Sequence, residues 1–285
     1  MEKQYGNLKI PDEFVDAISD GNLVLLTGAG VSKEAGLPDG WGLVDEVISM
    51  SSVPLANGER PEDYYDRLSA LGKEPNKLVN TIIQNRCSED SINCKHHKTL
   101  LNIHELPAYV RVVTINFDLL FDQACQELDM SLSRSVWPSL PQIFENLPLM
   151  GIVYLHGAIS DDGSPDLILT KHDYWVAYDD YKIAHQFLQN LFRTHSVALI
   201  GISADDAIYS HLLSAITGSK LVHFAFVPNA DLQDRQTGVQ NISYYAENIT
   251  RIRYEVNGKS HEELWQGLRL IAEACRRRRE GEAYD

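Results

Sequence analysis

Residues 23–39 read LVLLTGAGVSKEAGLPD. The run Leu23–Leu26 is apolar on both faces, as expected for the first strand of a sheet covered by helices on both sides. Gly28 and Gly30 follow it and can adopt backbone angles closed to other residues, so the chain can approach a pyrophosphate at a helix N-terminus. Ser32 is placed to cap that helix and to reach a phosphate. A tight turn that binds nothing explains the same glycines equally well, because the spacing departs from GxGxxG.

Further stretches have the buried-strand pattern, and helical patterns lie between them. The expected strands are 109–115, 152–155, 197–202, 221–227 and 249–254. The expected helices include 14–18, 119–125, 208–213 and 264–271. Strands that alternate with helices predict an α/β fold with a doubly wound, mostly parallel sheet.

The chain length allows one large α/β domain with a smaller insertion, since it has 285 residues. From Trp41 to Leu106 apolar residues recur at helical spacing, polar loops separate them, and no strand pattern intrudes. We therefore predict a single domain over 1–285, a helical insertion over 41–106, and a C-terminal helix with a charged tail over 258–285.

The charge balance excludes several classes of partner. The formal net charge is -15, which argues against general binding to nucleic acid or to an anionic membrane. Arg276–Arg279 is the exception, and we interpret it as a solvated helix end, although nucleic acid or an acidic partner could also contact it. No signal peptide and no apolar run of about 18 residues is visible, so we expect a cytoplasmic protein.

The cysteines argue against a disulfide framework. Cys87, Cys94, Cys125 and Cys275 lie at irregular spacings without a CxxC pair. This pattern fits free thiols in a reducing compartment and excludes a four-cysteine zinc site. A mixed site of Cys87, Cys94, His96 and His97 lacks the spacing of metal-binding knuckles, so we expect no metal.

Polar side chains follow the expected strands at their carboxyl ends, where open α/β sheets bind ligands. Asn116 and Asp118, in TINFD (114–118), place an amide and a carboxyl at the rim, although Asn116 could equally cap the next helix. His156, in LHG (155–157), could act as a general base near neutral pH, and Gly157 leaves room for a ligand. A purely structural histidine is the alternative.

The later strands also end in polar residues. Gly201 and Ser203 end the strand at 197–202 and are candidates for ligand contact. Asp205 and Asp206 open the following helix, where acids suit the helix dipole, so we favour a capping role for them. Asn229 follows the strand at 221–227 and could bond a ribose hydroxyl or simply form a turn.

Taken in order, these pieces resemble the sirtuin family. GAGVSKEAGLPD (28–39) looks like its cofactor loop, TINFD like its TxNxD motif, LHG like its catalytic His-Gly and GIS (201–203) like its nucleotide loop. The resemblance implies a Rossmann-type fold that binds NAD, with Asn116 and His156 catalytic and Asp118 near the nicotinamide carboxamide. By the same resemblance the NAD-binding residues are Gly28, Ala29, Gly30, Ser32, Asp39, Asp118, Gly201, Ser203 and Asn229.

The chain also departs from the deacylases of that family. It lacks their zinc ribbon of CxxC pairs, and the helical insertion stands in its place, so no zinc is expected. Gly40, Trp41 and Gly42 follow Pro-Asp where deacylases have Phe-Arg, and LILTKHDYWVAYDDY (167–181) shows no peptide-binding strand. These features resemble the sirtuin-like NAD hydrolases that act as effectors in bacterial antiphage defence.

The resemblance therefore implies an NAD hydrolase that releases nicotinamide and ADP-ribose, with NAD as its substrate. It also implies gating by homo-oligomerisation or a partner protein, for which the insertion and the residues after Leu264 are the expected surfaces. The alternatives are an NAD-dependent protein deacylase or ADP-ribosyltransferase, and a non-catalytic nucleotide sensor.

Overall fold

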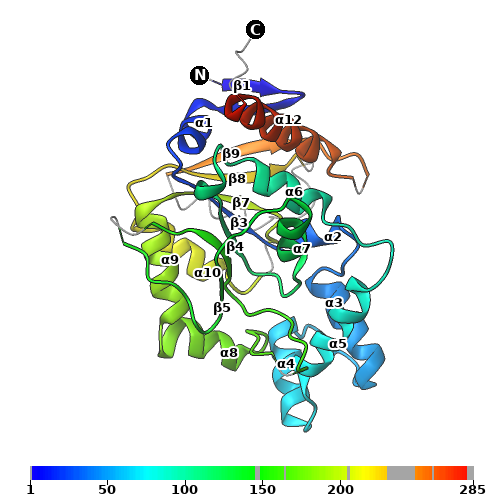
Figure 1. The fold of residues 1–285 in the computed structure, drawn as a ribbon. Helices are drawn as coiled ribbons and strands as arrows, with labels where there is room; N and C mark the ends of the chain where they lie inside the picture. Colours follow the sequence, from blue (N-terminus) through cyan, green and yellow to red (C-terminus); the bar gives the residue numbers. More distant parts are fainter. Residues whose placement is uncertain are drawn as a thin grey trace.

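Strand β3 (Leu23–Thr27) lies at the centre of a seven-stranded sheet with the order β5-β6-β4-β3-β7-β8-β9 (Figure 1). All neighbouring strands in this sheet are parallel. The computed structural model describes residues 2–144, 148–163, 165–203, 206–229, 248–258 and 260–280. The predicted α/β fold with a mostly parallel sheet is confirmed.

The remaining strands match the apolar runs of the sequence, with ends that differ by a few residues. They are β4 (Arg111–Thr114), β6 (Gly151–Tyr154), β7 (Ser196–Ile200), β8 (His223–Pro228) and β9 (Ile249–Tyr254). The exception is β5 (Arg134–Val136). β4 begins later than expected because a 3-10 turn, η1 (Pro107–Tyr109), precedes it. The sequence does not predict β5, since this edge strand has only three residues and none of them is fully buried.

A two-stranded antiparallel hairpin, β1 (Glu2–Tyr5) and β2 (Leu8–Pro11), precedes the sheet. It turns at Gly6, whose φ of 63° favours glycine, and it buries Leu8 and Ile10 in the main core. The expectation that Leu23–Leu26 is the first strand of the chain is therefore wrong, although it is the first strand of the sheet. The polar, largely exposed β1 carries no apolar pattern that could have marked it.

The central strand is buried on both faces because helices cover both sides of the sheet. Leu23 and Leu25 join one core and Val24 and Leu26 join the other. The first core includes residues of α1 (Asp12–Ser19), α6 (Lys95–Asn102), α7 (Leu120–Glu127) and α12 (Glu262–Arg279). The second includes residues of α9 (Ile183–Thr194) and α10 (Tyr209–Thr217).

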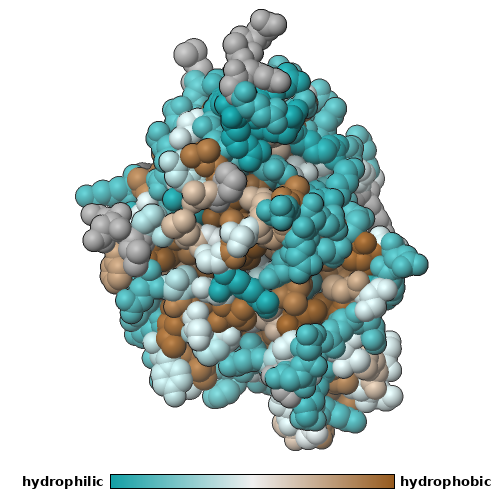
Figure 2. Space-filling view, in the orientation of Figure 1, coloured by the Kyte–Doolittle hydropathy of each residue, from teal (hydrophilic) through white to brown (hydrophobic). Residues whose placement is uncertain are grey.

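The C-terminal helix α12 carries the arginine run in its last turn. Arg276 pairs with Glu280 and Arg277 with Glu273, while Arg278 contacts Glu105. Figure 2 shows a largely hydrophilic surface over this helix, at the top of the view. The predicted tail after residue 280 lies outside the described residues. None of the described helices is long and apolar enough to cross a membrane.

The helices α3 (Gly40–Ser51), α4 (Pro61–Ala70) and α5 (Pro75–Cys87) share a core of their own. Val44, Tyr64 and Val79 lie in this core, which also receives Ile159 and Leu167 from the chain after β6. In Figure 1 the three helices form a separate blue and cyan group below the sheet. The fourth helix of the predicted insertion, α6, packs instead against α7 and α12.

The chain between β6 and β7 is helical. It forms α8 (Lys171–Trp175), the π-helix η2 (Val176–Asp180) and α9. Thr170 caps α8, because its side chain accepts from the backbone N–H of Asp173 and the Asp173 carboxylate accepts from the backbone N–H of Thr170. The sequence analysis predicts no helix here, although Phe187, Leu188 and Leu191 of α9 have helical spacing.

Candidate functional site

The glycine loop after β3 leads into a short helix, α2 (Ala29–Lys33). Gly28 has an extended backbone with φ -123°, and neither Gly28 nor Gly30 has a positive φ, so the predicted reason for these glycines is wrong. They are needed for a close approach instead. A Cβ on Gly30 would lie 2.8 Å from Cα of Gly201, and one on Gly28 would lie 2.8 Å from the Gly201 carbonyl oxygen.

This approach joins the glycine loop to the loop after β7. The backbone N–H of Gly30 donates to the Gly201 carbonyl (2.8 Å), and that of Gly28 donates to the Ile200 carbonyl (3.0 Å). Gly201 has a φ of 68°, which favours glycine. The predicted residues Gly28, Ala29, Gly30 and Gly201 therefore lie together, with Ser203 two residues further along the chain.

A buried set of hydrogen bonds, which we name the amide–carboxyl network, links Gly28, Ser32, Asn116 and Asp118. Nδ2 of Asn116 donates to Oγ of Ser32 (2.8 Å) and to the carbonyl of Gly28 (3.1 Å). Oγ of Ser32 donates in turn to Oδ2 of Asp118 (2.7 Å). Among the described residues no group donates to Oδ1 of Asn116.

The network corrects two of the predicted capping roles. Ser32 lies inside α2 rather than at its N-cap, where Gly28 stands. Asn116 does not cap the helix after β4; Oδ1 of Asp118 accepts from the backbone N–H of Leu120 at its start. The parallel pairing of β3 with β4 brings the first two sequence motifs together, since Thr27 lies beside Thr114.

Asp118 is 4% exposed, and its burial raises the pKa of its carboxyl group, against the lowering effect of the Ser32 and Leu120 hydrogen bonds. Cys87, in α5, lies close enough that burial first and the Asp118 charge second raise the pKa of its thiol to about 12. The helical group α3–α5 therefore reaches the candidate site at Asp118. A thiol with a pKa raised this far stays protonated at neutral pH.

His156, at the end of β6, is 2% exposed and lies outside the amide–carboxyl network. Its Nε2 lies 2.8 Å from the hydroxyl of Tyr178, on η2. Burial, followed by the charge of His211, lowers the pKa of the His156 ring to about 3. The ring is therefore neutral at pH 7 and, in this conformation, a weaker base than the sequence predicts.

Gly157 does not provide room for a ligand, so that prediction is wrong. Its φ is 89°, and a Cβ there would lie 2.1 Å from the carbonyl oxygen of Asp166. The backbone N–H of Ile168 donates to the His156 carbonyl (2.9 Å), which holds the same segment in place. The chain at 166–168 fills the space that the absent side chain leaves.

Aromatic and acidic side chains surround His156, and we name His156, Tyr174, Tyr178, His211 and Asp206 the tyrosine cluster. The rings of Tyr178 and His211 stack at 4.1 Å, and those of Tyr174 and Tyr178 stack at 5.9 Å. Tyr174 also donates a hydrogen bond to Asp206, whose pKa is raised to about 6, chiefly by burial. The sequence analysis misses both tyrosines, although their spacing of four residues would place them on one helix face.

The acidic pair after β7 differs from the expectation. Helix α10 begins at Tyr209, so Asp206 precedes it rather than opening it. Oδ1 of Asp206 accepts from the backbone N–H of Ile208 (3.1 Å), which is a local turn contact. Asp205 lies outside the described residues.

Two predicted binding residues have local partners away from the network. Asp39 is the N-cap of α3, where Oδ1 accepts from the backbone N–H of Gly42 (2.9 Å), and it forms an ion pair with Lys33 (2.5 Å). Asn229 is exposed, and its Nδ2 donates to Glu255 (2.8 Å). Neither contact links these side chains to Asn116 or His156.

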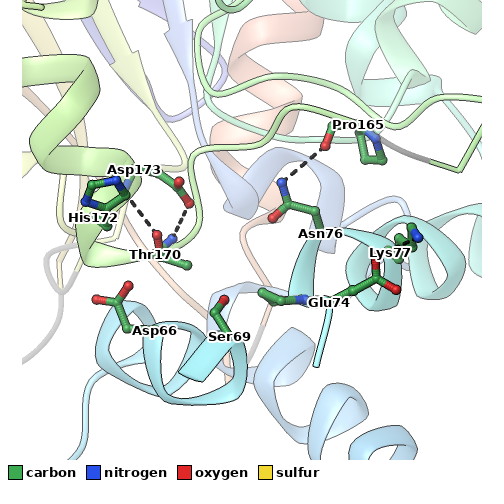
Figure 3. Close-up of a pocket in the computed structure, with 10 residues that line it drawn as sticks. Asp66, Ser69, Glu74, Asn76, Lys77, Pro165, Thr170, His172 and Asp173 are labelled. Atoms are coloured by element: carbon green, nitrogen blue, oxygen red, sulfur yellow. Dashed lines mark hydrogen bonds and ion pairs between the residues drawn. The ribbon is translucent and has the colours of Figure 1, made fainter. Parts of the chain in front are cut away.

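Two hollows in the described part of the chain lie beside the helical group α3–α5. Figure 3 shows the first, a cavity of about 500 Å³ between the α4–α5 turn and the chain at 165–173. Its polar groups bond to one another, as in the contact from Asn76 to the Pro165 carbonyl (3.1 Å). The second, of about 600 Å³, lies between α5 and α7 and includes Cys87, Leu119 and Leu120, next to Asp118.

The described residues contain no group of three metal-ligating side chains. All four cysteines are free. The residues of the mixed site considered above make other contacts: the His96 ring stacks on Trp265 (3.9 Å), and the His97 ring meets the edge of Phe121 (4.7 Å).

The chain is similar to a SIR2-like family model over about half of its length and to two curated proteins. Residues 110–250 match the family model of a SIR2-like domain. The chain is 28% identical over 231 residues to the uncharacterized protein y4cA of Sinorhizobium fredii (strain NBRC 101917 / NGR234), covering 74% of this chain and 19% of that protein. It is 23% identical over 205 residues to defense-associated sirtuin 2 of Bacillus subtilis, covering 71% of this chain and 20% of that protein. The chain thus spans about a fifth of the length of these curated relatives.

Solved structures described as "The Structural basis for Sirtuin Substrate affinity" and "Structural Basis for the Mechanism and Regulation of Sir2 Enzymes" also match. The first has a TM-score of 0.40 at 16% identity, covering 95% of this chain and 99% of that chain. The second has a TM-score of 0.41 at 14% identity, covering 95% of this chain and 100% of that chain.

Proposed function

We propose that the chain cleaves the nicotinamide–ribose bond of NAD and passes the ADP-ribose to water, a function that its similarity to a SIR2-like domain and to a defense-associated sirtuin supports. The observation that carries the proposal is the amide–carboxyl network. It joins Ser32 of the first sequence motif to Asn116 and Asp118 of the second, at the carboxyl ends of neighbouring parallel strands. Ligands of open α/β sheets bind at this edge.

The chemistry of the bond suits such a site. Nicotinamide leaves as a neutral molecule and the ribose gains oxocarbenium character, so the protein has mainly to position the reactants. Two hydrogen bonds from Nδ2 fix the Asn116 amide, which orients Oδ1 towards the ligand. In this proposal Asn116 positions the ribose and the attacking water, and Asp118 contacts the nicotinamide carboxamide.

The remaining predicted residues contribute to NAD binding in this proposal. The joined loops at Gly28–Gly30 and Gly201 hold the pyrophosphate, with Ser203 beside them. His156 acts as the base, on a ribose hydroxyl or on water. For Asp39 and Asn229 the support is limited to the resemblance, because Asp39 bonds Gly42 in its own turn and Asn229 bonds Glu255 after β9.

Water is favoured as the acceptor over acyl-lysine by the sequence. The chain has no CxxC pair, and the segment at 167–181 that would have to supply a peptide-binding strand contains α8 and η2. The name of the Bacillus relative suggests a defence role, and we propose that the chain depletes NAD in that setting. We further propose that a partner protein or self-assembly controls the activity, since free NAD hydrolysis would harm the host.

A second candidate is a nucleotide sensor without turnover. The contact between His156 and Tyr178 favours it, because it occupies Nε2 of the ring, one of the two nitrogens that could act as a base. Nucleotide binding without product, with every candidate partner present, is the outcome that supports the sensor.

Nicotinamide release tests the proposal. The purified chain is incubated with NAD, alone and with the products of neighbouring genes, and nicotinamide, ADP-ribose and acyl-transfer products are identified by mass spectrometry. Asn116→Ala and His156→Ala are expected to abolish release while the far-UV spectrum stays unchanged. Asn102→Ala is the matched control. The Asn102 amide donates to the Lys98 carbonyl on α6 and accepts from Arg279 on α12, away from the site. Near-normal release by the Asn116 and His156 variants would reject their roles.

A further inference from the structure

The hydroxyl of Tyr178 contacts Nε2 of the His156 ring. Nε2 of His156 and Oη of Tyr178 lie 2.8 Å apart, and both side chains are buried. A neutral imidazole nitrogen that acts as a base has a single lone pair, and that lone pair accepts one hydrogen bond. When the Tyr178 hydroxyl donates to it, a substrate hydroxyl cannot.

Three features hold Tyr178 in this position. Its ring stacks on His211 of α10 at 4.1 Å with planes inclined by 17°. The Tyr174 ring stacks on the Tyr178 ring at 5.9 Å, and it also meets the His156 ring edge-on at 5.3 Å. Tyr178 lies in the π-helix η2, a rare geometry that often occurs at functional sites.

The segment that carries the two tyrosines is bounded by distinct backbone features. The capping box at Thr170 precedes it, and Lys182, with a left-handed φ of 58°, separates it from α9. Its inner side contacts His156, whereas Trp175 is 50% and Tyr181 68% exposed on the outside. The segment therefore joins a buried contact with His156 to an exposed apolar surface within a few residues.

We propose that Tyr178 is a positioning residue whose hydroxyl occupies the place of the substrate ribose hydroxyl at Nε2 of His156. This inference rests on the proposed function, in which His156 is the base. The contact keeps Nε2 of the histidine from the substrate until the segment at 171–182 moves. It also assigns a function to LTKHDYWVAYDDY, which the four sequence motifs leave unused.

The low basicity of His156 agrees with this arrangement. Burial is the main cause of its lowered pKa, and His211 adds to it. Among the described residues, Tyr174, Tyr178 and His211 face the ring, and none of them is an anion at neutral pH. In that part of the chain no carboxylate contact is found that compensates for the burial of the ring, as would be needed for a strong base in this conformation.

Tyr178→Phe tests the proposal because it keeps the ring and its stacking and removes only the hydroxyl. We expect the His156 pKa, measured by NMR on protein with nitrogen-labelled histidine, to rise, and its tautomer ratio to change. We expect nicotinamide release from NAD to increase about three- to tenfold, which is the factor for losing one hydrogen bond. Tyr254→Phe is the control, because it removes a bond of the same kind, from Tyr254 to Nδ1 of His261 (2.9 Å), outside the tyrosine cluster.

The outcomes separate this inference from the proposed function. An unchanged His156 pKa in Tyr178→Phe, or a decrease in release, overturns the inference, since Tyr178 would then be inert or would assist the reaction. If no form of the protein releases nicotinamide, the proposed function fails. The NMR measurement then still decides whether Tyr178 controls His156. A thermal melt of each variant verifies that the fold is retained.

Discussion

The amide–carboxyl network and the tyrosine cluster lie at the same edge of one sheet but are built differently. In the network, every link joins residues of the glycine loop and α2, after β3, to residues after β4, and Asn116 bonds both Ser32 and the Gly28 backbone. In the tyrosine cluster, His156 depends on Tyr178, from a segment that follows it by more than twenty residues. The first region is set by strand pairing, whereas the second depends on how α8 and η2 pack. We therefore expect the network to be sensitive to single substitutions and the cluster to tolerate them.

Asn116→Asp, in the amide–carboxyl network, should cause the largest loss of stability. The substitution replaces the NH2 group that donates to the Gly28 carbonyl and to Ser32 with a carboxylate oxygen, which cannot donate. The new charge would also be joined to Asp118 by Ser32, which lies between them. An unpaired buried charge costs about 3 kcal/mol or more. Urea unfolding at pH 7 measures the loss, which should shrink towards pH 4 as the carboxyl takes up a proton.

Asn102→Asp is the control for this substitution, because Asn102 lies on α6 away from the network. Its effect should stay within about 0.5 kcal/mol, as for most surface changes. Equal losses in the two variants would mean that the network is no more rigid than the surface.

Gly30→Ala should have the next largest effect. Its Cβ would lie 2.8 Å from Cα and 2.9 Å from the carbonyl oxygen of Gly201, and both are backbone atoms that cannot rotate away. Overpacking of this kind costs about 1–3 kcal/mol, and NAD binding measured by calorimetry should weaken with it. Gly40→Ala, which meets no atom within 4 Å, should change stability by less than about 0.5 kcal/mol. If Gly30→Ala matches this control, the contact between the two loops does not constrain the site.

The sequence predicts the network better than the cluster for a physical reason. Leu23–Leu26 must be apolar because both faces are buried, and parallel pairing then brings the residues after β3 and β4 together. The position of a motif that follows a buried strand can therefore be predicted from the strand pairing. Asp39 and Asn229 fall outside this rule because their side chains bond other partners, Gly42 for Asp39 and Glu255 for Asn229.

The elements and contacts that the sequence does not predict lack such a constraint. β1 and β5 are short, and their residues are exposed or only half-buried, so no apolar pattern marks them. Tyr178 has helical spacing with Tyr174, but the sequence does not state that the helix faces His156. That contact depends on the extra residue in the π turn and on packing against α10, both of which are tertiary effects.

Asp206→Asn tests the tyrosine cluster through the pH dependence of the protein's stability. The carboxyl has an ordinary pKa of 3.8 when unfolded and about 6 in the cluster, chiefly because of burial. Between these values the folded state binds more protons than the unfolded state, so the wild-type stability decreases as pH rises. The variant lacks this loss, so its stability relative to the wild type should increase from pH 4 to pH 7. A difference that is constant with pH, in paired urea titrations, would show that Asp206 keeps its ordinary pKa when folded.

Asp39→Ala should have the smallest effect and should define where the network ends. Asp39 accepts from the Gly42 N–H as the N-cap of α3, and its ion pair with Lys33 is largely exposed. Losing a cap costs about 1 kcal/mol, and an exposed pair contributes less than about 0.5 kcal/mol. Asp39→Asn should therefore retain most of the stability, because it keeps the capping oxygen, while Lys33→Ala changes little. NAD affinity measured on the same variants separates the two possible roles: if it falls in Asp39→Asn while stability is retained, Asp39 belongs to the binding site and the network extends beyond Ser32.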